Sequence, residues 1–246
     1  RAHVAAMEAA APGVRELELE ALIDYTFRRE GGSGPGYTSI VGGGANACIL
    51  HYITNREPLK EGDLVLIDAG CELHWYTADV TRTFPVSGRF TEAQKELYNL
   101  VLEAQLACID HCRPGNSFKS IHDLAIRTLT EGMVRLGLLS GDVDKLIEDE
   151  DYKRYYMHGT SHWLGMDVHD VGSYVGLDGS RPLEAGMVLT VEPGLYVMPD
   201  DTDAPERFRG LGIRIEDDIA VTEGAPEVLT AGIPKTIDEV EAACGG

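Results

Sequence analysis

Basic residues are scarce in this sequence. It holds 21 Lys and Arg against 41 Asp and Glu in 246 residues, which gives a formal net charge of −20 at pH 7. Binding to nucleic acid or to anionic lipid needs clustered Lys and Arg that release counterions, and an acidic excess of this size opposes it. We therefore expect neither nucleic acid nor a membrane surface among the partners.

Cysteine pairs and long apolar runs are also missing. The five cysteines are odd in number and form no Cys-x-x-Cys motif, which disfavours a disulfide framework or a thiolate zinc site and favours a cytoplasmic location. No run approaches the roughly 18 apolar residues of a membrane-spanning helix. The composition, 43% hydrophobic and 25% charged, is typical of a globular protein.

Apolar spacing and capping residues predict the secondary structure. Thr91 with Gln94 forms a capping box, Ser117 caps the next helix, and Gly137 ends it. The predicted helices cover residues 2–10, 14–29, 91–111, 117–136 and 143–149. Extended segments are predicted at residues 38–41, 47–52, 64–68, 75–86, 188–191, 195–197 and 212–221. The chain starts at Arg1 within a helical pattern, so we expect a fragment that lacks an N-terminal part.

One segment of the sequence recurs. LKEGDLVLIDAG (59–70) aligns without gaps on LEAGMVLTVEPG (183–194), and in both copies a carboxylate, Asp68 or Glu192, ends the apolar run. A Pro-Gly pair also separates two helical stretches in each half of the chain. The recurrence predicts two similar halves packed into one domain, although three identities in twelve positions also arise by chance.

Four carboxylates and one imidazole form a candidate metal site. Asp68 and Glu192 end apolar runs, where an unpaired buried charge costs several kcal/mol. Asp79 and Glu216 lie on predicted strands, and His162 lies in HGTSHWLG. Hard carboxylate ligands suit Mn, Mg or Fe, and four of them suit two ions better than one. Taken singly, each acidic residue is more often a surface or ion-pair residue, so their joint placement carries the prediction.

A family resemblance rests on six blocks, which occur in this order: HYITNRE (51–57), LVLIDAGCE (64–72), TADVTRTFPVSG (77–88), MHGTSHWLGMDVHDVG (157–172), MVLTVEPGLY (187–196) and GIRIEDDI (212–219). They resemble the catalytic domain of Xaa-Pro aminopeptidases (aminopeptidase P), in the pita-bread metallopeptidase superfamily. The resemblance implies an α+β fold with two pseudo-twofold-related halves around a curved, mainly antiparallel sheet. Residues 1–246 would form a single metallopeptidase catalytic domain, without the separate N-terminal domain of the family.

The resemblance also implies a metal centre. Asp68, Asp79, His162, Glu192 and Glu216 would bind two divalent ions, usually Mn²⁺ in this family, with Asp79 and Glu216 bridging them. All five positions hold the residue type of the family. Two ions that share a water lower its pKa far below the bulk value of about 15.7, and Glu192 would accept the proton of this water.

Further site residues follow from the same resemblance. His51 and His158 would hydrogen-bond the substrate or its tetrahedral oxyanion, and His169 would stabilise that intermediate or pass a proton to the leaving proline nitrogen. Arg214 lies two residues before Glu216 on the same strand face and would orient the ligand carboxylates. Taken alone, a histidine of this kind is more often a packed or surface residue.

The predicted function is metal-dependent release of the N-terminal residue from peptides with proline in the second position, and a homo-oligomer is left open. A prolidase, which cuts Xaa-Pro dipeptides with a similar ligand set, is the nearest alternative. A methionine aminopeptidase fits less well because the block around His158 and His162 differs. A non-catalytic binding module with the pita-bread fold is a different class, which the retention of all five ligands disfavours.

Overall fold

The computed structural model describes residues 1–176 and 179–245. The five predicted helices are confirmed, and a sixth follows near the C-terminus: α1 (Ala2–Ala9), α2 (Glu16–Arg29), α3 (Glu92–His111), α4 (Phe118–Leu136), α5 (Val143–Glu148) and α6 (Ile237–Ala243). The predicted caps form as expected, since Thr91 and Gln94 make the capping box of α3, Ser117 caps α4, and Gly137 ends α4 in a left-handed conformation.

The described strands pair in antiparallel fashion and form three three-stranded sheets, two of which supply the repeated strands. One sheet has the order β2-β3-β6, with β2 (Ile40–Gly43), β3 (Leu64–Asp68) and β6 (Thr81–Pro85). The second has the order β13-β12-β9, with β9 (Val188–Val191), β12 (Asp217–Ala220) and β13 (Glu227–Val228). The third sheet has the order β1-β4-β5, with β1 (Gly34–Pro35), β4 (Cys71–Leu73) and β5 (Tyr76–Thr77). The remaining strands form two pairs, β7 (Val175–Gly176) with β8 (Gly179–Ser180) and β10 (Gly194–Tyr196) with β11 (Gly212–Arg214).

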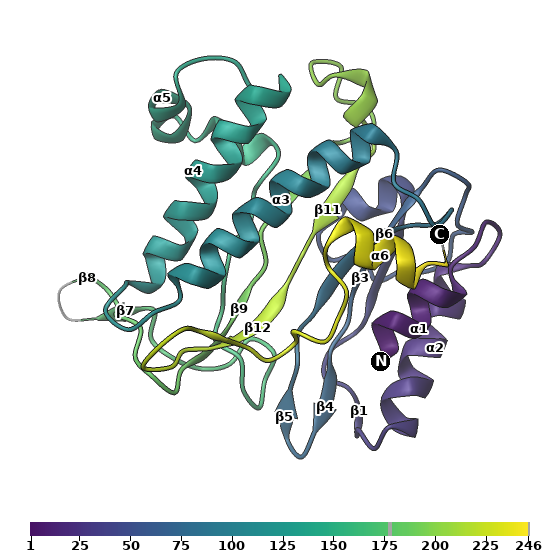
Figure 1. Cartoon of the computed structure of the whole chain (residues 1–246), viewed down its shortest axis with the longest axis horizontal. Coiled ribbons are helices and arrows are strands. Elements are labelled where there is room, and N and C mark those ends of the chain that lie inside the picture. Colours follow the sequence, from purple (N-terminus) through teal and green to yellow (C-terminus); the bar gives the residue numbers. More distant parts are fainter. Residues whose placement is uncertain (177–178, 246) are drawn as a thin grey trace.

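Each half of the chain pairs two helices with one of these sheets. Helices α1 and α2 contact each other, and α2 packs on β2, whereas α3 and α4 contact each other and α3 packs on β9 (Figure 1). Strand β3 ends with Asp68, and β9 ends immediately before Glu192. The two repeated sequence segments therefore form equivalent strands.

The connection before each of these strands is also repeated. Gly13 N–H donates to the carbonyl oxygen of Leu59, and Gly115 N–H donates to that of Leu183. Both glycines follow a proline and have a φ of 91°, a left-handed conformation that favours glycine. We call these two hydrogen-bonded connections the Gly–Leu clasps. They confirm the organisation in two similar halves.

A second repeated glycine is required because of close packing. A Cβ atom on Gly70 would lie 1.6 Å from the carbonyl oxygen of Ala78, and one on Gly194 would lie 2.8 Å from that of Ile213. Backbone atoms cannot move aside as a flexible side chain can. The position two residues after each carboxylate therefore admits glycine and little else.

Replacing Gly70 with alanine is expected to lower the free energy of unfolding by about 3 kcal/mol, the upper end of the usual cost of overpacking. Denaturant unfolding followed by circular dichroism would measure the change. Gly224→Ala is the matched control, because its Cβ would meet only the Thr222 hydroxyl at 3.9 Å. Equal stability of the two variants would contradict the packing argument.

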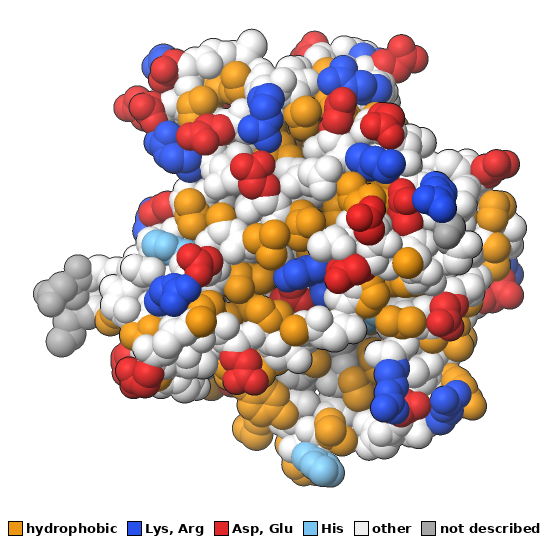
Figure 2. All heavy atoms as spheres, in the orientation of Figure 1, with side chains coloured by type: hydrophobic (Ala, Val, Ile, Leu, Met, Phe, Trp, Pro, Cys, Tyr) orange, Lys and Arg blue, Asp and Glu red, His pale blue; other side chains and the backbone are white. Residues whose placement is uncertain are grey.

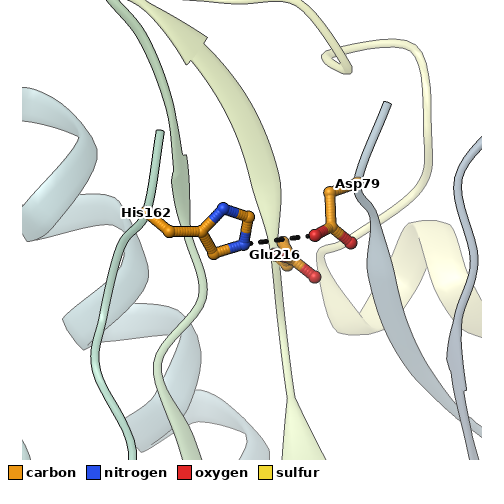
Figure 3. Close-up of side chains that lie close together, drawn as sticks. All are labelled: Asp79, His162 and Glu216. Atoms are coloured by element: carbon orange, nitrogen blue, oxygen red, sulfur yellow. Dashed lines mark ion pairs between the residues drawn. The ribbon is translucent and has the colours of Figure 1, made fainter. Parts of the chain in front are cut away.

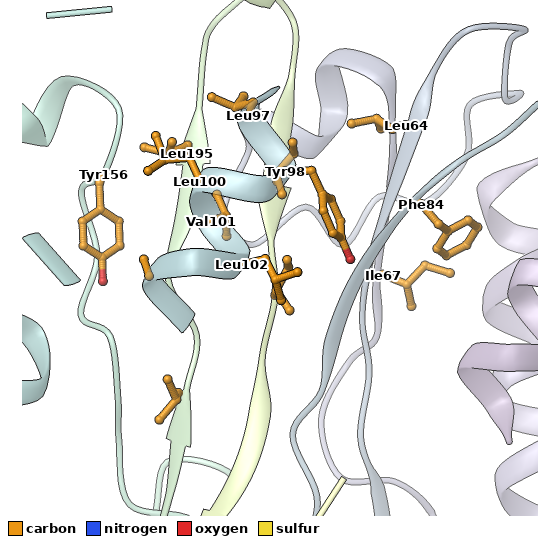
Figure 4. Close-up of a cluster of buried hydrophobic side chains, with 14 of the residues drawn as sticks. Leu64, Ile67, Phe84, Leu97, Tyr98, Leu100, Val101, Leu102, Tyr156 and Leu195 are labelled. Carbon is orange, nitrogen blue, oxygen red and sulfur yellow. The ribbon is translucent and has the colours of Figure 1, made fainter. Parts of the chain in front are cut away.

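The hydrophobic core runs through both halves. Tyr98, Leu100 and Val101 of α3 lie in the same cluster as Phe84 of β6 and Leu195 of β10 (Figure 4). Acidic and basic side chains are scattered over the face drawn in Figure 2, without a continuous patch of one sign. Among the described residues, no helix is long and apolar enough to span a membrane.

One predicted strand is wrong. Residues 47–52 were expected to be extended, but the chain forms a 3₁₀ helix, η1 (Gly44–Cys48), and then turns. Gly44 has a φ of 57°, which redirects the chain after β2. The helix η1 packs against β11, where a Cβ on Gly212 would lie 2.2 Å from the carbonyl oxygen of Ala47. This long-range contact has no local sequence signature.

Candidate metal centre

A cavity of about 280 Å³ collects all nine site residues that the sequence predicts. It lies between the two halves of the molecule, since Asp68 belongs to β3 and Glu192 follows β9. The residues that line it are Leu50, His51, Asp68, Asp79, His158, Gly159, Ser161, His162, His169, Glu192, Arg214 and Glu216. The structure therefore brings together predicted site residues that are up to 165 positions apart in the sequence, from His51 to Glu216.

The first half contributes Asp68 and Asp79. Asp68 is the last residue of β3, and Asp79 lies two residues before β6, which pairs with β3. The Tyr37 hydroxyl lies 2.5 Å from a carboxylate oxygen of each, so its single proton bridges the two acids. The backbone N–H of Asp79 donates to both carboxylate oxygens of Asp218 at 3.2 Å. These contacts fix both the side chain and the main chain of Asp79.

The second half contributes Glu192, Glu216 and His162. Glu192 is anchored at the end of β9, where its N–H donates to the carbonyl oxygen of Thr160 at 2.8 Å. Glu216 lies between β11 and β12 and is buried. Its Oε2 accepts a hydrogen bond of 2.7 Å from the Thr81 hydroxyl of β6. A residue of the first half thus orients a carboxylate of the second.

Asp79, His162 and Glu216 point toward one another (Figure 3). One potential ligand atom from each lies within 4.8 Å of the others. His162 Nε2 lies 3.2 Å from Asp79 Oδ2 and 3.6 Å from Glu192 Oε1. The other ring nitrogen, Nδ1, donates to the carbonyl oxygen of Trp163 at 3.0 Å, which directs Nε2 at the carboxylates.

Burial and mutual repulsion govern the protonation of these acids. Burial, followed by the charge of Asp68, raises the pKa of Asp79 to about 6. Burial also raises the pKa of Glu192 to about 8, and burial with the charge of Asp79 raises that of Glu216 well above its ordinary value. Burial alone would lower the pKa of His162, but Asp79 and Glu192 raise it to about 9. The cluster therefore favours positive charge in its centre.

Arg214 is the only Lys or Arg side chain among the described residues that line the cavity. It is buried, and its Nη2 donates to Asp68 Oδ2 at 2.7 Å. Its Nε donates to the Thr81 hydroxyl at 3.1 Å, and its Nη1 donates to the Tyr196 hydroxyl at 3.0 Å. One guanidinium cannot neutralise four carboxylates, but it holds Asp68 and two hydroxyl groups in fixed orientations.

The three remaining histidines lie around the same cavity in different environments. His158 Nδ1 donates to the Gly159 carbonyl oxygen at 2.7 Å, and its Nε2 lies 2.8 Å from the Tyr196 hydroxyl. Burial, followed by the charge of Arg214, lowers the pKa of His158 to about 3, so this ring is neutral. His169 makes a T-shaped contact with His162, with ring centroids 4.4 Å apart. His51 lines the cavity and is exposed.

Comparison with known proteins decides the family. The model of metallopeptidase family M24 matches residues 1–223. The chain belongs to metallopeptidase family M24. The Xaa-Pro aminopeptidase of Haemophilus influenzae is 54% identical to it over 239 residues, which cover 97% of the chain and 55% of that relative. The Xaa-Pro aminopeptidase of Escherichia coli is 53% identical over 241 residues, 98% of the chain and 54% of the relative.

Solved structures agree with this assignment. Aminopeptidase PepP of Pseudomonas aeruginosa matches with a TM-score of 0.98 and 54% identity, over 100% of this M24 chain and 55% of that one. A zinc-substituted E. coli aminopeptidase P in complex with product matches with a TM-score of 0.95 and 52% identity, over 99% and 55% of the two chains. The predicted family and pita-bread fold are confirmed. The chain spans about half the length of the curated relatives it matches.

Several residues of the M24 site escaped the sequence analysis. Tyr37, Thr81, Tyr196 and Asp218 bond to the predicted site residues or to their main chain. Tyr196 and Asp218 lie within the recognised blocks, two residues after Gly194 and Glu216, so their position was a usable signal. Tyr37 lies outside every block, and nothing in its local sequence indicates that its hydroxyl reaches two carboxylates.

The donor set fits divalent cations. Four carboxylates and one imidazole border a single cavity, and oxygen-rich sites of this kind suit hard or borderline metal ions. Burial, followed by repulsion from neighbouring carboxylates, raises the pKa of Asp79 and Glu216, and bound cations would offset that repulsion. A metal-ligating histidine commonly donates its second N–H to a carbonyl group, as His162 does to Trp163. The residues present therefore fit the metals that the family name implies.

Proposed function

We propose that this chain is the catalytic domain of a dinuclear metallo-aminopeptidase that releases the N-terminal residue from peptides with proline in the second position. The observation that carries the proposal is the convergence of five metal-ligand side chains from both halves on one cavity. The chain's similarity to Xaa-Pro aminopeptidases supports the choice of substrate.

Asp68, Asp79, His162, Glu192 and Glu216 would hold two divalent ions, with Asp79 and Glu216 bridging and Mn²⁺ as the proposed metal. Asp79, Glu216 and His162 each have a potential ligand atom within 4.8 Å of the other two, which supports bridging roles for the two carboxylates. Bound there, such ions supply Lewis acidity and a water of lowered pKa. Asp68, held by Tyr37 and Arg214, lies on one side of the cluster.

Glu192 is proposed as the general base. Its Oε1 lies 3.6 Å from His162 Nε2, and its Oε2 lies 3.7 Å from His158 Nδ1. A general base must lie within reach of the group that it deprotonates, and Glu192 lines the cavity beside His162. Glu192 is also less deeply buried than Glu216, so it can meet both water and substrate.

His51 and His169 are proposed to bind the peptide and its tetrahedral intermediate, with His169 close to His162 and passing a proton to the leaving proline nitrogen. His158 is proposed to bind the substrate as well. Both of its ring nitrogens are already engaged, by Gly159 and Tyr196. Donation to a substrate therefore requires His158 to exchange its bond with Gly159, which makes it a less immediate donor than His51. Arg214 is proposed as a positioning residue.

The substrate preference separates the proposal from its alternatives. We expect the purified chain with added Mn²⁺ to release the first residue from an Xaa-Pro-Xaa tripeptide, and to cleave the Xaa-Pro dipeptide more than about tenfold less efficiently. A dipeptidase needs a free cation to bind the C-terminal carboxylate of its substrate, whereas Arg214, the one Lys or Arg side chain among the described residues that line the cavity, is already bonded to Asp68. Chromatography of the released amino acid would measure both rates.

Each result that contradicts the proposal would favour a different function. Faster cleavage of the dipeptide would favour a prolidase. Equal cleavage of Xaa-Pro-Xaa and Xaa-Ala-Xaa would contradict the requirement for proline. Absence of both bound metal and cleavage would favour a non-catalytic binding module with the same fold. Sedimentation of the chain would report the oligomeric state, for which a homo-oligomer remains the proposal.

A further inference from the structure

A buried ionic cluster lies directly behind the metal centre. Asp217 is the first residue of β12 and follows Glu216 on the chain, but unlike Glu216 it does not line the cavity. Its carboxylate is fully buried and accepts four hydrogen bonds. Oδ1 accepts from Arg82 at 2.7 Å and from Thr230 at 2.6 Å, and Oδ2 accepts from Gln105 at 2.8 Å and Lys235 at 2.7 Å.

Arg82 is the second component of this cluster, and its guanidinium is fully buried. Besides Asp217, it donates to four backbone carbonyl oxygens: those of Thr81 at 2.9 Å, Glu216 at 2.5 Å, Ile233 at 3.2 Å and Pro234 at 2.9 Å. A lysine could not reach these acceptors together, because its ammonium is a single point and the guanidinium is a rigid fork.

The cluster ties three parts of the chain together. Arg82 belongs to β6, Asp217 begins β12, and residues 230–235, which we call the C-terminal strap, supply Thr230 and Lys235. Tyr98 of α3 also donates to the carbonyl oxygen of Lys235 at 2.8 Å. The strap is thereby hydrogen-bonded to β6, β12 and α3.

The cluster joins two strands, β6 and β12, that are not paired with each other in a sheet. Strand β6 pairs with β3, whereas β12 pairs with β9 and β13. Between β6 and β12, Glu216 N–H donates to the carbonyl oxygen of Thr81 at 3.1 Å, and Arg82 donates to the carbonyl oxygen of Glu216. The main chain of Glu216 is thus held on both sides by residues of β6, three positions or fewer after Asp79.

Stability alone gives a weak reason for such a cluster. Apolar residues of similar volume can replace a buried ion pair without loss of stability in many proteins, because desolvation offsets the attraction. A precise geometric task is a stronger reason. Mutation of the residues that orient metal ligands typically costs about 10- to 100-fold in metal affinity or activity.

We infer that Arg82, Asp217 and Lys235 are positioning residues that set the separation of Asp79 and Glu216 through the C-terminal strap. The inference rests on the proposed function, because these two carboxylates are its proposed bridging ligands. The strap does not line the cavity. It fixes the positions of Arg82 and Asp217, and Arg82 of β6 in turn holds the main chain of Glu216.

Two variants test the inference, and each has a matched control. Arg82→Lys keeps the charge but loses the fork, and Lys235→Met removes one cation at the partly exposed rim of the cluster, where folding is least at risk. Arg127→Lys and Lys145→Met make the same changes in exposed ion pairs with Asp144 and Asp149. Equilibrium dialysis against Mn²⁺ would give the affinities, and electron paramagnetic resonance would report the coupled ion pair.

The affinity for the more weakly bound Mn²⁺ ion is expected to fall about 10- to 100-fold in both cluster variants. The resonance signal of the coupled ion pair should weaken as well. Both are measured at a temperature where circular dichroism shows that every variant is folded. The controls should stay within about twofold of the wild type. A lower melting temperature with unchanged Mn²⁺ affinity in both cluster variants would overturn the inference. A wild-type chain that binds no Mn²⁺ would instead overturn the proposed function, and this inference with it.

Discussion

Replacing Glu216 with glutamine is expected to lower kcat/KM for an Xaa-Pro-Xaa peptide about a thousandfold or more. One potential ligand atom of Glu216 lies within 4.8 Å of one from Asp79 and one from His162, and an amide cannot bridge two cations as a carboxylate does. Loss of one bridging ligand removes several kcal/mol of transition-state stabilisation, and each 1.4 kcal/mol or so is a factor of ten. Steady-state kinetics with excess Mn²⁺ and metal analysis of the purified variant would measure the effect.

Glu241→Gln is the matched control for this change. Glu241 is also a buried carboxylate, but it lies on α6 and pairs with Arg89 at 3.0 Å, outside the cavity. The control should keep the metal content and kcat/KM of the wild type within a few-fold, whatever its stability. If Glu216→Gln retained both metal ions and near-normal activity, the assignment of Glu216 as a bridging ligand would be wrong.

Removal of the metal is expected to abolish activity and to lower the melting temperature by about 5–10 °C. Without cations, Asp68, Asp79, Glu192 and Glu216 lie in one cavity, where Arg214 is the single arginine among the lining residues that the structure describes. A ligand that binds only the folded state stabilises it by about 2.7 kcal/mol at a concentration a hundred times its Kd, and 1 kcal/mol corresponds to about 2–4 °C in a chain of this size. Differential scanning calorimetry before and after chelation would measure the shift.

Restoration separates this effect from damage by the chelator. Addition of Mn²⁺ after the chelator is removed should return both the melting temperature and the activity. The Glu216→Gln variant should show a smaller shift on chelation, because it has less metal to lose. An unchanged melting temperature after verified metal removal would count strongly against a metal centre between the two halves.

The helices were predictable because their signals are local. Each signal depends on residues within four positions of one another, as in the capping box of Thr91 and Gln94 and in Gly137 at the end of α4. The carboxylate at the end of each repeated strand was also visible, since Asp68 and Glu192 stand at the same point of the repeat. The prediction of a strand over residues 47–52 was wrong because the conformation of this segment depends on contact with β11, far along the chain.

The supporting contacts of the site were beyond prediction for the same reason. Tyr37 bonds to Asp79 across 42 positions, and Thr81 bonds to Glu216 across 135. Neither hydrophobic periodicity nor a capping motif predicts a hydrogen bond between side chains that are so far apart in the sequence. The sequence blocks identified which residues meet in the cavity, whereas the structure alone identifies the hydroxyl and guanidinium groups that orient them.

The two Gly–Leu clasps have a consequence for the order of folding. Each clasp closes a loop within one half, from Gly13 to Leu59 and from Gly115 to Leu183, and loop-closure entropy grows only slowly with length. Each half can thus collapse around its own loop, whereas the bond from Thr81 to Glu216 spans 135 positions and needs both halves in place. Contacts of such high contact order form late. The cavity would then be the last region to gain protection from amide hydrogen exchange during refolding.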